Sequence, residues 1–325
     1  MSTDFPNEAP RKAGQRILSL WFPYLAAERL LRQRLGRSWR SRPPAHAPLV
    51  LSRQENNARR IAALDERAEA LGLKRGMGLA DARAMHPGLD VVEADADADR
   101  RLLESLADWC DRYTPLVALD GEDGLFLDVT GCVCLFGGER AMLDDMLARF
   151  FHQGFEVRAA IASTAGAAWA AARFRGRLLV APGEEPALLT PLPPAALRIG
   201  PETCGRLEGV GLRSAGAVMA MPRAPLARRF GARLLMRLDQ ALGRLDEAVS
   251  PRLPVPPLSA ERQLGEPVTR AEDVEALTQM LAARLQPGLE RRGEGARSLA
   301  LSLFGSTAPS AASPSAPRGR CAIPR

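Results

Sequence analysis

Residues 116–131 read Leu-Val-Ala-Leu-Asp-Gly-Glu-Asp-Gly-Leu-Phe-Leu-Asp-Val-Thr-Gly, and they give the clearest structural signal of the sequence. Two apolar runs, 116–119 and 124–129, flank the turn residues Asp120-Gly121-Glu122, a pattern that predicts a β-hairpin. Side chains alternate between the faces of a sheet, so Asp123 and Asp128 are expected on opposite faces. Taken alone, both are ordinary carboxylates at strand ends, although Asp123 stands where a strand could present a metal ligand.

The segments around this hairpin predict a mixed α/β (α+β) domain. Strands are expected at 16–22 and 156–163, and helices at 24–35, 94–109, 138–151 and 165–175. The order strand, helix, hairpin, helix, strand is typical of a ferredoxin-like sheet with helices on one face. Between the first helix and the hairpin, we expect a short apolar run at 48–52, an alanine-rich helix at 57–72 and a short helix at 79–85.

Composition limits the classes of protein that fit. The chain has 325 residues, enough for two or three domains, and 46% hydrophobic residues, which excludes wholesale disorder. No apolar run approaches the roughly 20 residues that span a bilayer, and the polar start is unlike a secretory signal, so the expected location is cytoplasmic. The odd number of cysteines predicts no disulfide framework, and no zinc site is expected at Cys132 and Cys134. A net charge of +6 favours a polyanionic partner.

A second constellation lies at Leu207-Glu-Gly-Val-Gly-Leu212, between two expected short helices. Glycines at a tight turn let backbone N–H groups approach a DNA phosphate, so this segment predicts a helix-hairpin-helix motif. A plain helical hairpin is the alternative. The arginines around it favour DNA, and the candidate DNA-binding residues are Arg206, Gly209, Gly211, Arg213, Arg228 and Arg229.

Proline-rich stretches suggest where the domains divide. Residues 182–194 contain five prolines and residues 251–257 contain four, so both are expected to be linkers. Beyond the second stretch we expect a strand at 262–264, a helix at 271–285 and a strand at 298–304. Residues 305–325 are rich in Ala, Ser and Pro and are expected not to pack.

The run Leu125-Phe-Leu-Asp-Val-Thr-Gly131 resembles the palm motif of Y-family DNA polymerases, the UmuC/DinB-like superfamily. The resemblance extends to 17–28, 72–87, 160–173 and the glycine hairpin, and covers roughly residues 14–250. It implies a flexible N-terminus at 1–13, palm and fingers at 14–181 (fingers about 26–92), and a helix-hairpin-helix thumb with flanking linkers at 182–256. A truncated little-finger-like segment at 257–304 and a disordered tail at 305–325 follow.

The site residues depart from the family pattern. Active members resemble one another in holding two Mg²⁺ ions with three carboxylates, of which only Asp123 is matched here. Leu20 and Gly124 align with the other two. Glu66 and Glu69 align with a tyrosine and an arginine that hold the incoming triphosphate, and Leu25, or Tyr24 next to it, aligns with the aromatic steric gate.

A palm that lacks two of the three carboxylates resembles that of the ImuB subfamily, which is catalytically inactive. The resemblance implies a non-catalytic DNA-binding adaptor in DNA damage-induced (SOS) translesion synthesis, with no intact catalytic residues, no metal and no cofactor. Implied partners are damaged or primer-template DNA, a replicative-type error-prone polymerase, the sliding clamp and RecA-associated factors. No clamp-binding region is recognisable in the sequence, however, and a truncation or frame disruption near Gly305 is suspected.

Two alternatives stay open. One is an active DNA-directed DNA polymerase using Mg²⁺ held by Asp120, Glu122 or Asp128; the other is a truncated product that only binds DNA.

Overall fold

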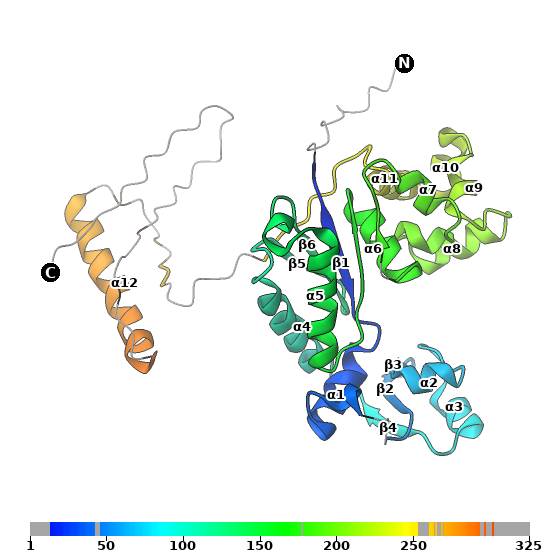
Figure 1. Cartoon of the computed structure of the whole chain (residues 1–325), viewed down its shortest axis with the longest axis horizontal. Coiled ribbons are helices and arrows are strands. Elements are labelled where there is room, and N and C mark those ends of the chain that lie inside the picture. Colours follow the sequence, from blue (N-terminus) through cyan, green and yellow to red (C-terminus); the bar gives the residue numbers. More distant parts are fainter. Residues whose placement is uncertain are drawn as a thin grey trace. The chain divides into compact units, whose positions relative to one another are not determined.

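The chain is described from a computed structural model that covers residues 14–252, apart from 43–45 and Arg177, together with helix 271–292 and a few isolated positions between 260 and 301. It divides into two units, Met1–Leu253 and Pro254–Arg325, each described here by itself (Figure 1). Across these residues, no helix combines the length and the apolar character needed to cross a membrane.

A five-stranded sheet with the order β5-β6-β1-β7-β8 forms the centre of the first unit (Figure 1). The central strand β1 pairs in antiparallel fashion with β6 and with β7, and β5 completes the predicted hairpin with β6. The short strand β8 lies parallel to β7. Their bounds are β1 Ile17–Trp21, β5 Val117–Asp120, β6 Gly124–Asp128, β7 Arg158–Ala162 and β8 Leu178–Leu179.

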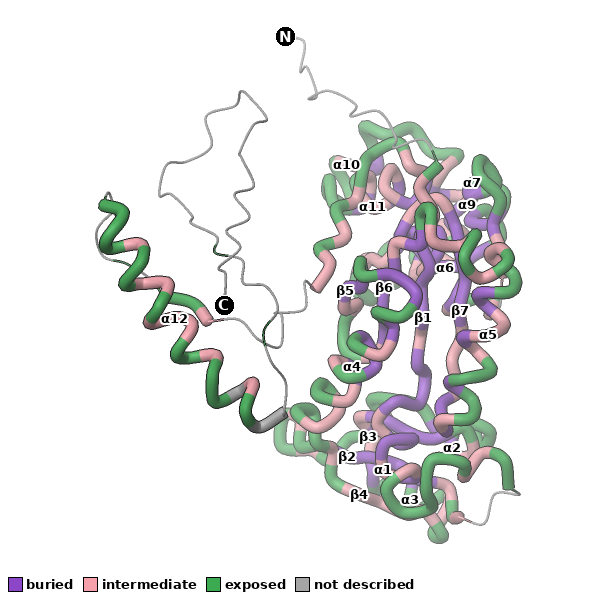
Figure 2. The backbone as a smooth tube through the Cα atoms, turned by 60° about the vertical axis from the view of Figure 1, so that its left-hand side comes forward, coloured by how far each residue is buried: buried purple, intermediate pink, exposed green. Residues whose placement is uncertain are grey.

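Helices cover both faces of this sheet, so the prediction of helices on one face was wrong. Helices α4 (Ala96–Cys110) and α5 (Glu139–His152) pack with Leu18 and Leu20 on one face. Helix α6 (Ala165–Phe174) packs with Ile17 and Phe126 on the other. Apart from the buried Ser19, the residues of β1 are apolar on both sides of the sheet, and each side therefore needs a cover. Figure 2 shows the buried residues concentrated along the sheet and α6.

The predicted fingers form a smaller three-stranded sheet with the order β3-β2-β4, partly covered by helices. The prediction of one helix over 57–72 was wrong, because its first half is strand β3. Asn56 and Asn57 adopt left-handed conformations with φ of 46° and 61° and turn the chain back between β2 and β3. The helix starts only after the cap at Asp65, whose side chain accepts a hydrogen bond from the N–H of Ala68. The elements are α1 Leu25–Leu35, η1 Trp39–Ser41, β2 Leu49–Glu55, β3 Ala58–Leu64, α2 Glu66–Ala70, α3 Leu79–Met85 and β4 Asp90–Glu93.

The predicted thumb is a group of short helices that packs against α6. Its first part, expected to be a proline-rich linker at 182–194, contains a helix, and Leu189 and Leu192 there are buried in the core that α6 shares. Prolines occupy first-turn positions of these helices, where a missing N–H costs nothing. The elements are α7 Glu185–Leu189, η3 Pro194–Leu197, α8 Pro201–Glu208, α9 Ala215–Met219, α10 Arg223–Phe230 and α11 Ala232–Ala241.

The second unit is described mainly by one helix, α12 (Ala271–Arg292), which confirms the helix predicted at 271–285 and extends it. Of the strand predicted at 262–264, Arg262 and Leu264 are described, and neither lies in a strand. The strand predicted at 298–304 falls largely outside the described residues, and the tail at 305–325 and the N-terminus at 1–13 lie outside them.

Candidate functional site: a carboxylate held by arginines

Asp123 lies at the turn from β5 into β6, beside the end of the central strand. Trp21, the last residue of β1, pairs with Gly124 in the register of the sheet. Its indole Nε1–H donates a hydrogen bond to Oδ2 of Asp123 across 3.1 Å. The backbone carbonyl of Asp123 accepts a second bond, from the N–H of Phe22 at 2.8 Å. The end of β1 therefore fixes both the backbone and the side chain of Asp123.

Two guanidinium groups also contact this carboxylate. Arg75, from the loop between α2 and α3, reaches Oδ2 of Asp123 at 3.3 Å. Arg173, from α6, lies 3.4 Å from Oδ1 of Asp123 and 3.2 Å from Oδ2 of Asp120. Arg198 approaches the other oxygen of Asp120 at 3.6 Å. The two carboxylates therefore serve as counter-ions of arginines.

Aromatic rings hold Arg173 in place. Its guanidinium carbon lies 4.3 Å from the ring centroid of Trp169 and 5.4 Å from that of Trp21, and its side chain is 13% exposed. Burial lowers the pKa of the Arg173 guanidinium, while Asp120 and Asp123 oppose that shift. Arg173 is thus a largely buried cation, packed between two indole rings and two carboxylates, and it has a structural role.

Gly124 aligns with a metal-binding carboxylate of the polymerases, and the structure has no space for a side chain at this position. A Cβ atom at this position would lie 2.9 Å from the carbonyl oxygen of Asp120 and 3.1 Å from Nη2 of Arg173. A side chain at 124 would therefore have to displace the backbone of the hairpin or the guanidinium.

Leu20, which the sequence aligns with the other absent carboxylate, points away from Asp123. It is fully buried in the core beneath α4 and α5. The residue of β1 that contacts Asp123 is the next one, Trp21. Sequence reasoning missed Trp21, Arg75 and Arg173 as site residues. Apart from the buried Ser19, β1 is apolar, so its sequence shows no alternation that points to the tryptophan.

The donor set at this place does not fit a pair of magnesium ions. Mg²⁺ needs oxygen ligands in octahedral geometry, and Asp123 already shares its two oxygens with an indole and two guanidiniums. Within the described ranges, no three His, Cys, Asp or Glu side chains gather as metal ligands would. Asp128 lies at the far end of β6, opposite Ile17, and its carboxylate accepts from the N–H of Thr130.

Glu66 and Glu69, the residues aligned with the triphosphate contacts, each have a partner within the protein. The hydroxyl of Tyr24 donates to Oε2 of Glu69, and burial, followed by this hydrogen bond, raises the pKa of the tyrosine. Glu66 lies 3.4 Å from a guanidinium nitrogen of Arg40. Leu25 is buried in the palm core, whereas Tyr24 packs in the core of the fingers. Two carboxylates here would repel a triphosphate.

The glycine turn of the thumb has the predicted form, but its N–H groups are already used. Gly211 has φ of 86° and an exposed position, and a Cβ atom there would meet nothing within 4 Å. The N–H groups from Gly209 to Arg213 all donate to carbonyls within residues 205–211. At the start of α9, the N–H groups of Ala215 and Gly216 donate to carbonyls of the preceding segment. These internal hydrogen bonds compete with phosphate for the N–H groups, and contact of Gly209 and Gly211 with DNA stays a prediction.

Arginine side chains provide the cations of the thumb surface. Arg206 from α8 donates to the carbonyl of Arg229 in α10, and both guanidiniums lie over Phe230, at 5.4 and 5.6 Å from its ring centroid. Arg213 and Arg228 are exposed, and neither forms an ion pair with another residue of the described set. The structure thus brings Arg206 and Arg229 together and leaves Arg213 and Arg228 open to solvent.

Comparisons with known proteins agree with this architecture. Residues 40–173 match the model of the impB/mucB/samB family. Protein ImuB of Caulobacter vibrioides is 47% identical over 228 residues, which cover 70% of this chain and 50% of the relative. An Escherichia coli DNA polymerase IV is 27% identical over 239 residues, 69% of this chain and 64% of that protein. The chain thus spans about half the length of the ImuB relatives that it matches.

Solved structures show the same fold. DinB from Sulfolobus solfataricus superposes with a TM-score of 0.58 at 20% identity, covering 72% of this chain and 69% of that one. The insertion ternary complex of Dbh DNA polymerase gives a TM-score of 0.59 at 19% identity, over 72% and 69% of the two chains. Residues 14–252 therefore form a Y-family (UmuC/DinB) polymerase-like unit whose sequence is similar to that of ImuB proteins.

Proposed function

We propose that this chain is a non-catalytic, cytoplasmic DNA-binding adaptor in DNA damage-induced translesion synthesis and mutagenesis. One observation carries the proposal: Asp123, the only matching carboxylate, is held by Trp21, Arg75 and Arg173 where a polymerase would bind metal. The likeness to ImuB supports the damage-response role, and the polymerase-like fold supports binding to primer-template DNA. The protein partners, namely an error-prone polymerase, the sliding clamp and RecA-associated factors, are part of this proposal.

Electrostatics disfavours the alternative of an active polymerase. Two unit charges 4 Å apart interact by about 4 kcal/mol at the effective dielectric of a protein surface, so each Mg²⁺ beside Arg173 would meet a substantial repulsion. A rebuilt metal site would have to use Asp120, Glu122 and Asp123, because Asp128 lies five residues beyond Asp123, at the other end of β6. It would also have to displace Arg173 from two of these carboxylates.

Nucleotide is expected to leave DNA affinity unchanged. A polymerase closes on primer-template more tightly when the matching deoxynucleotide and metal are bound, whereas Glu66 and Glu69 repel the triphosphate here. Fluorescence anisotropy with a dideoxy-terminated primer-template should give the same Kd with and without Mg²⁺ and the matching nucleotide. Tighter binding with the matching nucleotide only would contradict the adaptor proposal.

The exposed thumb arginines are expected to set part of the salt dependence of DNA binding. In the double variant Arg213→Ala/Arg228→Ala, the slope of log K against log salt on duplex DNA should fall by about 2, because each phosphate contact contributes about 1. The matched control is Arg83→Ala/Arg140→Ala, which removes two exposed charges from α3 and α5. Equal slopes in the two double variants would place DNA elsewhere on the protein.

A further inference from the structure

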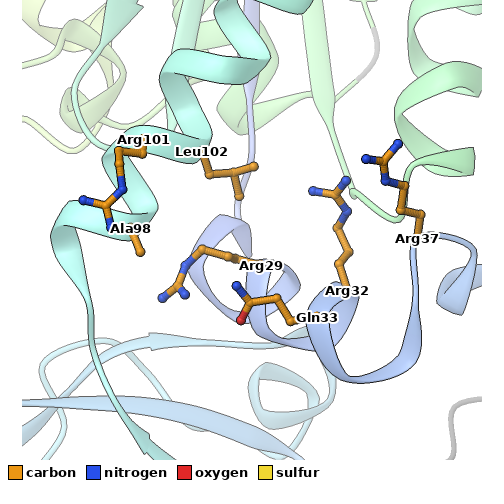
Figure 3. Close-up of a pocket in the computed structure, with 7 residues that line it drawn as sticks. All are labelled: Arg29, Arg32, Gln33, Arg37, Ala98, Arg101 and Leu102. Atoms are coloured by element: carbon orange, nitrogen blue, oxygen red, sulfur yellow. The ribbon is translucent and has the colours of Figure 1, made fainter.

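An open groove of about 470 Å³ separates α1 from α4, and arginines dominate its lining (Figure 3). One wall comes from α1 and the loop after it, and the other from the first turns of α4. Figure 3 shows the side chains of both walls around the space between the two elements. The lining residues are Arg29, Arg32, Gln33, Arg37, Ala98, Arg101 and Leu102.

The sequence places these residues on facing sides of the two helices. Arg29, Arg32 and Gln33 are three and four residues apart, which puts them on one face of α1, and Ala98, Arg101 and Leu102 repeat this spacing on α4. Nε of Arg29 lies 2.6 Å from Oδ1 of Asp99, so an ion pair joins the walls. This ion pair fixes the position of α1 relative to α4 and therefore the width of the groove between them.

The groove carries an excess of positive charge. In the described part of the chain, no carboxylate forms an ion pair with Arg32, Arg37 or Arg101, and Asp99 offsets Arg29 alone. Arg32 lies over the ring of Phe155, 4.1 Å from its centroid, and its Nε is buried without a hydrogen-bond partner. Burial, and then the charge of Arg37, lowers the pKa of Arg32, while Glu28 opposes that shift. Glu28 is already ion-paired with Arg40, so the excess of positive charge in the groove favours an anionic ligand.

The shape and chemistry of the groove indicate which anion. Small-molecule pockets enclose most of their ligand, whereas this groove is open along two helix faces. Protein interfaces depend on buried aromatic or aliphatic anchors, and here Leu102 is the one large apolar side chain among the lining residues. Guanidinium groups along an open channel match the repeated phosphates of a nucleic acid strand. We propose that the α1–α4 groove binds the phosphate backbone of single-stranded DNA.

This contact is separate from the thumb. Helix α4 packs on one face of the five-stranded sheet, while α6 and the thumb helices share the core on the other. The groove thus gives the protein a second DNA contact beyond its thumb arginines, suited to an unpaired strand. The inference rests on the proposed DNA binding.

The test is a salt series on the full-length chain with a deoxythymidine oligonucleotide, from about 50 to 200 mM salt. Arg37 and Arg101 are exposed, so Arg37→Ala/Arg101→Ala removes charge without opening a core. Its slope of log K against log salt should be lower by about 1.4, from two contacts of about 0.7 each on a single strand. Arg83→Ala/Arg140→Ala, with the same change in net charge, should keep the wild-type slope.

The outcomes separate this inference from the proposed function. A wild-type chain that binds neither single-stranded nor duplex DNA would contradict both. DNA binding with an unchanged slope in the groove variant would contradict the inference alone. Loss of tripolyphosphate or polyglutamate binding in the groove variant, with oligonucleotide binding intact, would also overturn it, because the groove would then serve a free oligophosphate or an acidic protein segment.

Discussion

Replacing Arg173 by methionine is expected to lower the free energy of unfolding by about 3 kcal/mol, because it removes the largely buried guanidinium that Asp120 and Asp123 share. The remaining cations are Arg198, 3.6 Å from Asp120, and Arg75, 3.3 Å from Asp123. Asp120 and Asp123 are 13% and 20% exposed, and Arg173 is the residue that contacts both. For a unit of this size, the loss corresponds to a fall in Tm of roughly 6–12 °C. Thermal unfolding followed by circular dichroism measures it.

Two further variants show whether the lost counter-charge is the cause. Adding Asp120→Asn and Asp123→Asn to Arg173→Met should recover part of the loss, since amides cost less to bury than carboxylates that have lost a counter-ion. Arg140→Met on the exposed face of α5 should change stability little. A neutral Arg173→Met, or a triple variant less stable than the single one, would show that the arginine does not hold this site together.

Adding one methyl group at Gly166 is expected to lower the free energy of unfolding by about 1–3 kcal/mol through overpacking. A Cβ atom at Gly166 would lie 2.8 Å from Cα and 3.0 Å from Cβ of Ala241, where α6 meets α11. Thr164, the cap of α6, donates to the carbonyl of the same alanine at 2.9 Å. Urea unfolding of Gly166→Ala, with an unchanged m-value, measures the loss.

The matched control is Gly205→Ala in the thumb helix α8. This glycine also lies inside a helix, but a Cβ atom there would meet nothing within 4 Å. Alanine should therefore stabilise the protein by about 0.5–1 kcal/mol through its higher helix propensity. If Gly166→Ala is neutral or stabilising, as Gly205→Ala is expected to be, the close contact between α6 and the thumb is not present in solution.

The sequence was sufficient for the central hairpin because turn residues separate two apolar runs at 116–131. On β1, the alignment placed Leu20 at the site, whereas the residue that contacts Asp123 is the next one, Trp21. Residues 17–22 are apolar except for Ser19, and Ser19 is itself fully buried, so no polar alternation fixes which residues face Asp123. The helix predicted at 57–72 failed for a similar reason, since alanines outweighed the turn signal of Asn56-Asn57.

The arginines of the site could not be found from local patterns. Arg75 and Arg173 lie 48 and 50 residues from Asp123, in the fingers and in α6, and only the packing of these elements brings them together. In the thumb, the glycine turn was predicted, but the carbonyls that occupy the N–H groups at the start of α9 belong to Thr190 and Leu192, in the preceding segment. Hydrogen-bond partners of this kind depend on tertiary structure.

Primer extension tests the central claim most directly, that a Y-family-like palm whose single matching carboxylate is held by arginines does not polymerise DNA. The unchanged chain is incubated with undamaged and lesion-bearing primer-templates, all four deoxynucleotides, and Mg²⁺ or Mn²⁺, after the same preparation has been shown to bind the DNA. The account predicts binding without extension under every condition. Extension that disappears in Asp123→Ala would contradict it and establish a rebuilt metal site.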